Sequence, residues 1–84
     1  MMIPKEINST HIEAAAKEID INGVPTRRGA RKYLVQIGCT LYPPKYLISI
    51  ATKYLTGKEL DPLDFIAPEA KVYLEKKGYK IVSK

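Results

Sequence analysis

Reactive side chains are scarce in this sequence. Among its 84 residues there is one cysteine, Cys39, and one histidine, His11. A single thiol permits no internal disulfide and is too few for a zinc site built on cysteines. The scattered acids complete no set of nucleophile, base and orienting group. The sequence therefore predicts a protein that is not an enzyme and that carries no metal or other cofactor, with Cys39 and His11 as ordinary structural residues.

Long hydrophobic runs are absent as well. No apolar run approaches the roughly 18 residues of a membrane span, and the N-terminus, MMIPKEINST, lacks the basic and apolar regions of a secretion signal. Gly29 and Gly38 are not accompanied by the further glycines of a nucleotide-binding loop. Asp61 and Asp64 lie in a turn-rich stretch and are typical of turn and cap residues rather than of a metal site. We expect a cytoplasmic protein without a membrane partner.

What the sequence does contain is typical of a small folded domain. Hydrophobic residues make up 45% of the chain and charged residues 27%, which is far from the composition of disordered chains. We expect one domain over 1–84, in which residues 1–9 form a loosely ordered N-terminal segment. A domain of this size buries only about 60–65% of the surface of its unfolded chain, so any functional site should be shallow.

Proline, glycine and hydrophobic periodicity divide the chain into helices and strands. The expected elements are a helix over 10–21, a hairpin of two strands within 32–42, a helix over 44–55, a helix over 68–77 and a strand over 79–82. The order α-β-β-α-α-β predicts an α+β fold with three helices packed on a small sheet. The helix over 44–55 carries apolar residues on most of its sides, so it should be the most buried helix.

Local signals refine this interpretation at two places. Thr10 and Glu13 have the spacing of a capping box at the start of the first helix, in which the hydroxyl and the carboxylate satisfy early backbone N–H groups. The stretch 61–65 is typical of a turn-rich connector, and its apolar residues Leu63 and Phe65 are expected to anchor it to the core.

Positive charge is concentrated in the middle of the chain. The net charge is +5, yet residues 24–58 contain seven cations and no acid, whereas the remainder has seven cations against nine acids. A segregated basic field attracts polyanions without reading their sequence, so nucleic acid is the first partner to consider. A solvated surface is the alternative, and charge alone leaves the two equally open.

The cations of this region fall on two expected elements. The segment GVPTRRGARKY over 23–33 leads into the first strand, and the helix over 44–55 has one narrow polar stripe. The candidate phosphate contacts on these elements are Thr26, Arg27, Arg28, Arg31, Lys32, Lys45, Ser49 and Lys53. Arginine offers phosphate a bidentate fork, and lysine offers a point charge. Neighbouring tyrosines such as Tyr46 are interpreted as core residues rather than as platforms for stacked bases.

Many residues of the chain also match a known pattern. The match runs from Ile12 to Val82, and its most specific part is YPPKY at 42–46 followed by TGKEL at 56–60. Its other carriers are Glu18-Ile19-Asp20, Gly23-Val24-Pro25, Arg28, Tyr33-Leu34, Gly38, Ile48-Ser49, Ala51, Tyr54, Pro62, Phe65, Leu74, Gly78 and Ile81-Val82. The chain resembles the N-terminal head domain of McrA-like, modification-dependent restriction endonucleases, a module also seen in related HNH-nuclease proteins. Here Ile66-Ala67-Pro68 replaces the glycine-rich segment that this family has before its last helix.

The resemblance implies an accessory α+β domain that works inside or beside a DNA-restriction system, together with its other domains or subunits. This chain has no HNH motif and no length for a base-flipping pocket, so neither cleavage nor modified-base recognition is carried over. The first hypothesis, which rests on the charge, is a non-enzymatic module that contacts the backbone phosphates of duplex DNA. The alternative is a protein-docking module that links nuclease or ATPase components without direct DNA contact.

Overall fold

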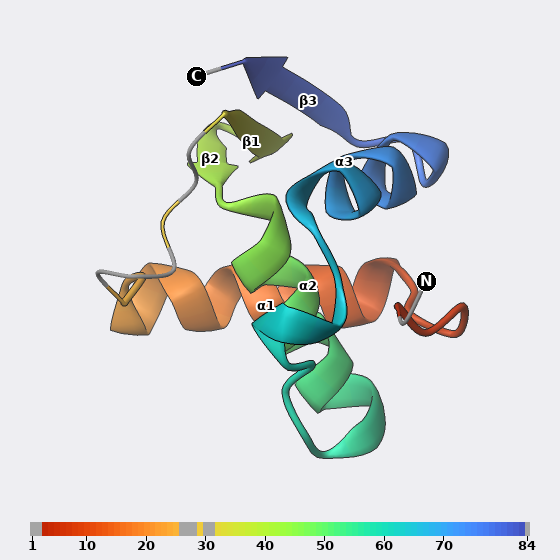
Figure 1. The fold of residues 1–84 in the computed structure, drawn as a ribbon. Coiled ribbons are helices and arrows are strands. Elements are labelled where there is room, and N and C mark those ends of the chain that lie inside the picture. Colours follow the sequence, from red (N-terminus) through yellow and green to blue (C-terminus); the bar gives the residue numbers. More distant parts are fainter. Residues whose placement is uncertain (1–2, 26–28, 30–31, 84) are drawn as a thin grey trace.

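Three helices and a three-stranded antiparallel sheet form the molecule (Figure 1). The computed structural model describes residues 3–25, 29 and 32–83. The elements are α1 (Ser9–Asn22), β1 (Tyr33–Ile37), β2 (Thr40–Tyr42), α2 (Pro44–Thr56), a short 3-10 helix η2 (Pro62–Asp64), α3 (Ala67–Lys76) and β3 (Lys80–Ser83). The strand order in the sheet is β2-β1-β3. The predicted α+β class and the order α-β-β-α-α-β are confirmed.

Helix α1 begins one residue earlier than expected, with a different cap. The side-chain oxygen of Asn8 accepts hydrogen bonds from the backbone N–H groups of Thr10 at 2.9 Å and His11 at 3.3 Å. The backbone N–H of Asn8 donates in return to Nδ1 of His11 at 3.1 Å. The expected capping box of Thr10 and Glu13 is therefore wrong, because Asn8 satisfies the early N–H groups instead. Gly23, with a φ of 76°, ends the helix as expected.

The sheet is built on the predicted hairpin. Strands β1 and β2 are joined by a two-residue loop, in which Gly38 has a φ of 62° that favours glycine. Strand β3 pairs with the other edge of β1, so that Val35 lies between Tyr42 of β2 and Ile81 of β3. Val35 is fully buried and Ile81 packs against the core, which means that this face of the sheet is turned toward the helices.

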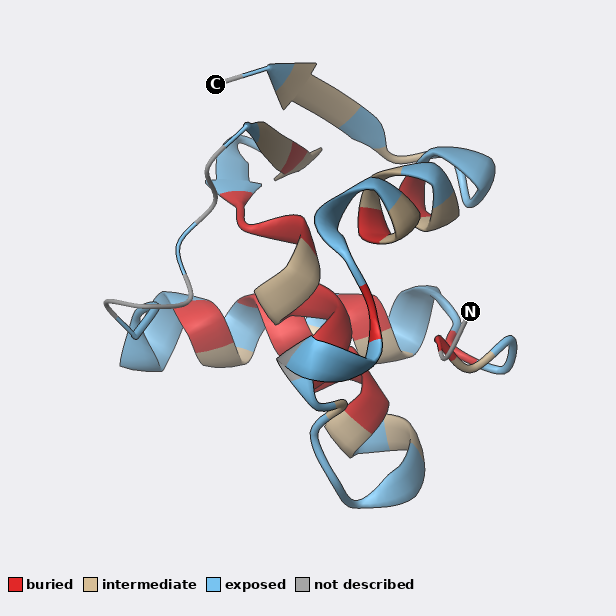
Figure 2. Ribbon diagram, viewed as in Figure 1, coloured by how far each residue is buried: buried red, intermediate tan, exposed pale blue. Residues whose placement is uncertain are grey.

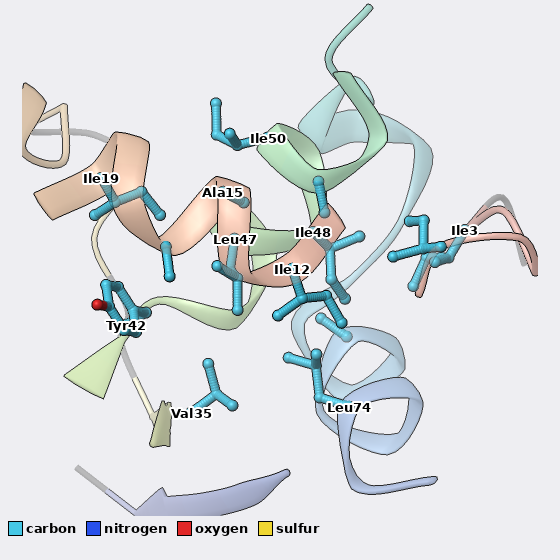
Figure 3. Close-up of a cluster of buried hydrophobic side chains, with 14 of the residues drawn as sticks. Ile3, Ile12, Ala15, Ile19, Val35, Tyr42, Leu47, Ile48, Ile50 and Leu74 are labelled. Carbon is cyan, nitrogen blue, oxygen red and sulfur yellow. The ribbon is translucent and has the colours of Figure 1, made fainter. Parts of the chain in front are cut away.

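Helix α2 is the most buried helix, as predicted. Its buried residues are Pro44, Leu47, Ile48, Ser49, Ile50, Ala51 and Thr52. Pro44 stands in the first helical turn, where its missing N–H costs no hydrogen bond, and Gly57 ends the helix in the left-handed conformation. Figure 2 shows α2 in red along most of its length, where it crosses α1. In the core shown in Figure 3, side chains of α1, β1 and α3 surround Leu47 and Ile48.

The N-terminal segment is packed rather than loose. Ile3 is 6% exposed and Ile7 is 1% exposed, and both belong to the buried cluster. The hydroxyl of Tyr73 on α3 donates to the carbonyl oxygen of Pro4 at 2.7 Å. The expectation of a loosely ordered segment over 1–9 is therefore wrong from residue 3 onward, because a core this small uses the two isoleucines as cover. Residues 1 and 2 lie outside the described part of the chain.

Only one of the two expected anchors of the connector after α2 is buried. Phe65 is 2% exposed and belongs to the core, whereas Leu63 is 92% exposed. The side chain of Asp61 accepts a hydrogen bond from the backbone N–H of Leu63 at 2.9 Å, so Asp61 is the cap of η2. This confirms the interpretation of Asp61 as a turn and cap residue. Because this cap fixes the turn locally, the Leu63 side chain need not be buried to hold it.

The centrality of α2 predicts a large stability loss when its core is truncated. Ile48→Ala should lower the free energy of unfolding by about 2–5 kcal/mol, because the fully buried side chain loses transfer energy and leaves a cavity. Leu63→Ala is the control, and its effect should stay within about 0.5 kcal/mol, since that side chain is exposed. Urea denaturation measures both, and a loss below about 1 kcal/mol for Ile48→Ala would contradict the assignment of α2 to the centre.

Candidate nucleic-acid interface

The basic segment, residues 23–32, joins the end of α1 to the start of β1. Its described residues Gly23, Val24, Pro25, Gly29 and Lys32 are all exposed. The predicted contacts Thr26, Arg27, Arg28 and Arg31 lie outside the residues that the structure describes. The structure therefore defines where this segment starts and ends, and both of these points are at the surface.

A hydrogen bond ties together the two elements that carry the segment. The hydroxyl of Tyr42, in the hairpin, donates to Oδ1 of Asp20, in the last turns of α1, at 2.8 Å. Tyr42 is 4% exposed, and its burial, followed by the hydrogen bond to Asp20, raises the pKa of its hydroxyl. The hydroxyl thus stays a neutral donor at physiological pH. The end of α1 and the hairpin are held together at the base of the basic segment.

Lys53 does not present a free cation. Its Nζ lies 2.6 Å and 2.7 Å from the two carboxylate oxygens of Glu18 on α1. The hydroxyl of Tyr54 donates to the same carboxylate at 2.8 Å. Hydrogen bonds from Lys53 and Tyr54 lower the pKa of Glu18, and the bond to Glu18 raises the pKa of Lys53. A phosphate at Lys53 would compete with a carboxylate already in place.

The predicted polar stripe of α2 differs from the observed one at Ser49. This residue is fully buried, and its hydroxyl donates to the carbonyl oxygen of Leu60 at 2.8 Å. The prediction that Ser49 lies on an exposed stripe is wrong, because α2 is covered on this side by the chain that follows it. Lys45 is half-buried, with Nζ 5.0 Å from the ring centroid of Phe65 in a cation–π contact.

The hydrogen bonds of Glu18 with Lys53 and Tyr54, and of Asp20 with Tyr42, were not predicted from the sequence. Glu18 lies 35 residues before Lys53, and Asp20 lies 22 residues before Tyr42, so no local spacing links them. The tyrosines were interpreted as core residues, which is correct for Tyr42, at 4% exposure, and wrong for Tyr54, which is 46% exposed. One signal was available: Glu18 and Asp20 are the acids that come just before the acid-free region.

The described residues show little sign of other kinds of site. They contain no group of three or more histidine, cysteine, aspartate or glutamate side chains that could hold a metal ion. None of their helices is long and apolar enough to cross a membrane. A shallow open depression beside α1 is lined by Thr10, Glu13, Ala14 and Lys17. Comparison of the chain with protein-family models, curated proteins and solved structures finds no match.

The pair between Glu18 and Lys53 predicts a pH-dependent contribution to stability. The folded state lowers the pKa of Glu18 below its ordinary value, so this contribution is present at neutral pH and is lost as the pH falls through the folded pKa. Glu18→Gln should cost about 0.5–1 kcal/mol at pH 7 and progressively less in acid. Thermal unfolding between pH 7 and pH 3 measures the difference from the unmodified chain.

The matched control for this variant is Glu75→Gln on α3. Glu75 is paired with Lys71 at 3.4 Å and its side chain is 46% exposed, so removing its charge should cost less than removing that of Glu18. A difference between Glu18→Gln and the unmodified chain that stays constant from pH 7 to pH 3 would show that the ionised carboxylate is not what stabilises the contact.

The buried hydroxyl of Ser49 predicts a structural role. Ser49→Ala should lower the free energy of unfolding by about 0.5–1.5 kcal/mol, because the fully buried hydroxyl and its hydrogen bond to the carbonyl oxygen of Leu60 are lost. Ser83→Ala, at an exposed position of β3, should change it by less than about 0.5 kcal/mol. Chemical denaturation of the two variants compares them, and equal effects would contradict the role assigned to Ser49.

Proposed function

We propose that this chain is a non-enzymatic module that binds duplex DNA through the basic segment between α1 and β1. The observation that carries the proposal is the charge distribution, with seven cations and no acid over 24–58. Such a field raises the local concentration of a polyanion and its rate of association. The exposure of Val24, Pro25, Gly29 and Lys32 supports it further, since the segment starts and ends on the surface.

The contacts in this proposal are to backbone phosphates. Arg27, Arg28 and Arg31 offer bidentate forks, Lys32 a point charge, and Thr26 a hydroxyl. Lys45 adds a cation close to the base of the segment, because it follows Tyr42 by three residues and Tyr42 is bonded to the end of α1.

Two residues of the predicted set are left out of the binding surface. Ser49 is buried, and the charge of Lys53 is compensated by Glu18. The proposal thus places the phosphate contacts on the segment itself and on Lys45, rather than along the length of α2.

The setting of this activity is proposed from the resemblance. A head-like domain of a restriction system would hold duplex DNA in the cytoplasm while other domains or subunits recognise the modified base and cut. Four residues that carry the resemblance, Glu18, Asp20, Tyr42 and Tyr54, make the hydrogen bonds that tie α1 to the hairpin and to α2. In this chain these four residues therefore have a structural role.

A salt titration with charge variants tests the proposal. Arg27→Ala combined with Arg28→Ala should weaken binding to all duplex sequences alike, because phosphate contacts carry little base information. The slope of log affinity against log salt should become shallower by about one for each phosphate that the variant no longer neutralises. Fluorescence anisotropy with two labelled duplexes of unrelated sequence measures both effects.

The control removes the same charge elsewhere. Lys5→Ala combined with Lys76→Ala takes two exposed cations from outside the basic segment and should leave the salt slope nearly unchanged. If the double variant Arg27→Ala, Arg28→Ala binds duplex DNA at low salt as tightly as the unmodified chain, the DNA-binding proposal fails. The single variant Arg28→Ala distinguishes two roles of this arginine. If Arg28 stabilises the segment through Asp20, its removal would lower the melting temperature. If it only contacts phosphate, the melting temperature would stay the same.

A further inference from the structure

The sheet has a second face, which is turned away from the helices. Side chains alternate between the faces of a strand, and Val35, Ile37 and Ile81 pack into the core. The ring of Tyr33 lies under Nζ of Lys71 on α3 at 5.3 Å, so Tyr33 shares their face. The opposite face, here called the outer sheet face, is formed by Leu34, Gln36, Leu41, Lys80 and Val82.

The residues of the outer sheet face are neighbours across the three strands. Leu34 pairs with Val82, and Gln36 pairs with Leu41 on one side and with Lys80 on the other. Leu41 is 46% exposed, and Leu34 and Val82 are partly buried. In Figure 1 α1 and α2 lie below the sheet and α3 lies beside it, and Figure 2 shows β3 in the colours of partly buried and exposed residues. Three aliphatic side chains are thus gathered where no described helix covers them.

The charge around these aliphatic side chains has one sign. Lys80 belongs to the outer sheet face, Lys32 precedes β1 by one residue, and both are exposed. No acid occurs in β1, β2 or β3. A second copy of the chain, with the same net charge of +5, would bring lysine against lysine in a face-to-face pair. An acidic partner is complementary, because it would place carboxylates where the lysines stand.

The chemistry of the surface favours a peptide over a nucleic acid. Bases need aromatic rings for stacking, and none of the five residues of the outer sheet face is aromatic. Three strands at a spacing of about 4.8 Å give a surface about 10 Å wide, which is close to the diameter of an α-helix. A helix laid on this face would cover it as helices cover the faces of sheets within domains.

We propose that the outer sheet face docks an acidic amphipathic helix of a partner protein. The apolar stripe of that helix packs on Leu34, Leu41 and Val82, and its carboxylates pair with Lys32 and Lys80. Leu41, Val82 and Lys80 lie outside the basic segment, so this surface meets the proposed DNA contact only at Lys32.

A designed peptide serves as the probe. It has about 18 residues, with leucine at every third or fourth position and mainly glutamate and alanine elsewhere, so that it forms a helix with one apolar stripe. A scrambled peptide of the same composition has the same charge and no stripe. Anisotropy should give an affinity about tenfold or more higher for the amphipathic peptide than for the scrambled one. Amide signals in a labelled chain should shift over β1, β2 and β3.

Variants of exposed residues locate the surface. Leu41→Ser and Lys80→Glu should each lower the peptide affinity about fivefold or more, because one removes apolar contact and the other reverses a charge. Leu63→Ser in η2 and Lys58→Glu after α2 are the matched controls, and they should change it less than about twofold. The melting temperature of each variant verifies that it is folded. If Leu41→Ser does not fold, Lys80→Glu still tests the surface.

Several outcomes would overturn the proposal. Equal binding of the scrambled peptide, or equal losses in the control variants, would reduce the effect to non-specific attraction. A dimer in sedimentation that Leu41→Ser dissolves would make a second copy the occupant. A loss of duplex DNA affinity in Leu41→Ser would assign the face to nucleic acid. The DNA proposal is judged separately, by the loop variant Arg27→Ala with Arg28→Ala.

Discussion

Burial of α2 on most of its surface is the constraint on which the rest of the structure depends. A helix of 13 residues with Leu47, Ile48, Ile50 and Ala51 buried must be covered from several directions, and in 84 residues few elements are available to do so. Helix α1, β1, α3 and the N-terminal isoleucines all contribute to this cover. Even the polar residue Ser49 is enclosed, with its hydroxyl satisfied by a carbonyl oxygen. Among the described residues, the hollow on α1 is an open depression lined by Thr10, Glu13, Ala14 and Lys17, so binding there would be to a surface.

Polar contacts then fix how α1 sits on this core. Glu18 and Asp20 accept hydrogen bonds from Lys53, Tyr54 and Tyr42, so that the end of α1 is held to both α2 and the hairpin. These contacts have two consequences for function. They fix both ends of the basic segment. They also compensate the charge of Lys53, so that this lysine contributes less to the attraction of a polyanion. Four of the seven cations of residues 24–58 belong to the segment before β1.

The two proposed binding surfaces adjoin at Lys32. This residue closes the basic segment and stands beside the outer sheet face, where Leu34, Leu41 and Val82 form an apolar centre. A cationic segment suits phosphates, and an apolar centre with lysines at its margin suits an acidic helix. A small domain with both surfaces would connect a nucleic acid to a protein, which is the task of an accessory module. Neither surface requires a cavity, in keeping with the small core.

The sequence by itself determined the elements, because proline, glycine and hydrophobic period act over a few residues. It predicted the hairpin, the central helix and the order of elements, and it placed the positive charge in 24–58. It did not predict that Asn8 caps α1, since Thr10 and Glu13 offered an equally good local pattern. Only the tertiary structure decided which polar residues are available. Glu18 meets Lys53, and Ser49 meets Leu60, after the chain has folded back on itself, and such pairings depend on packing rather than on spacing.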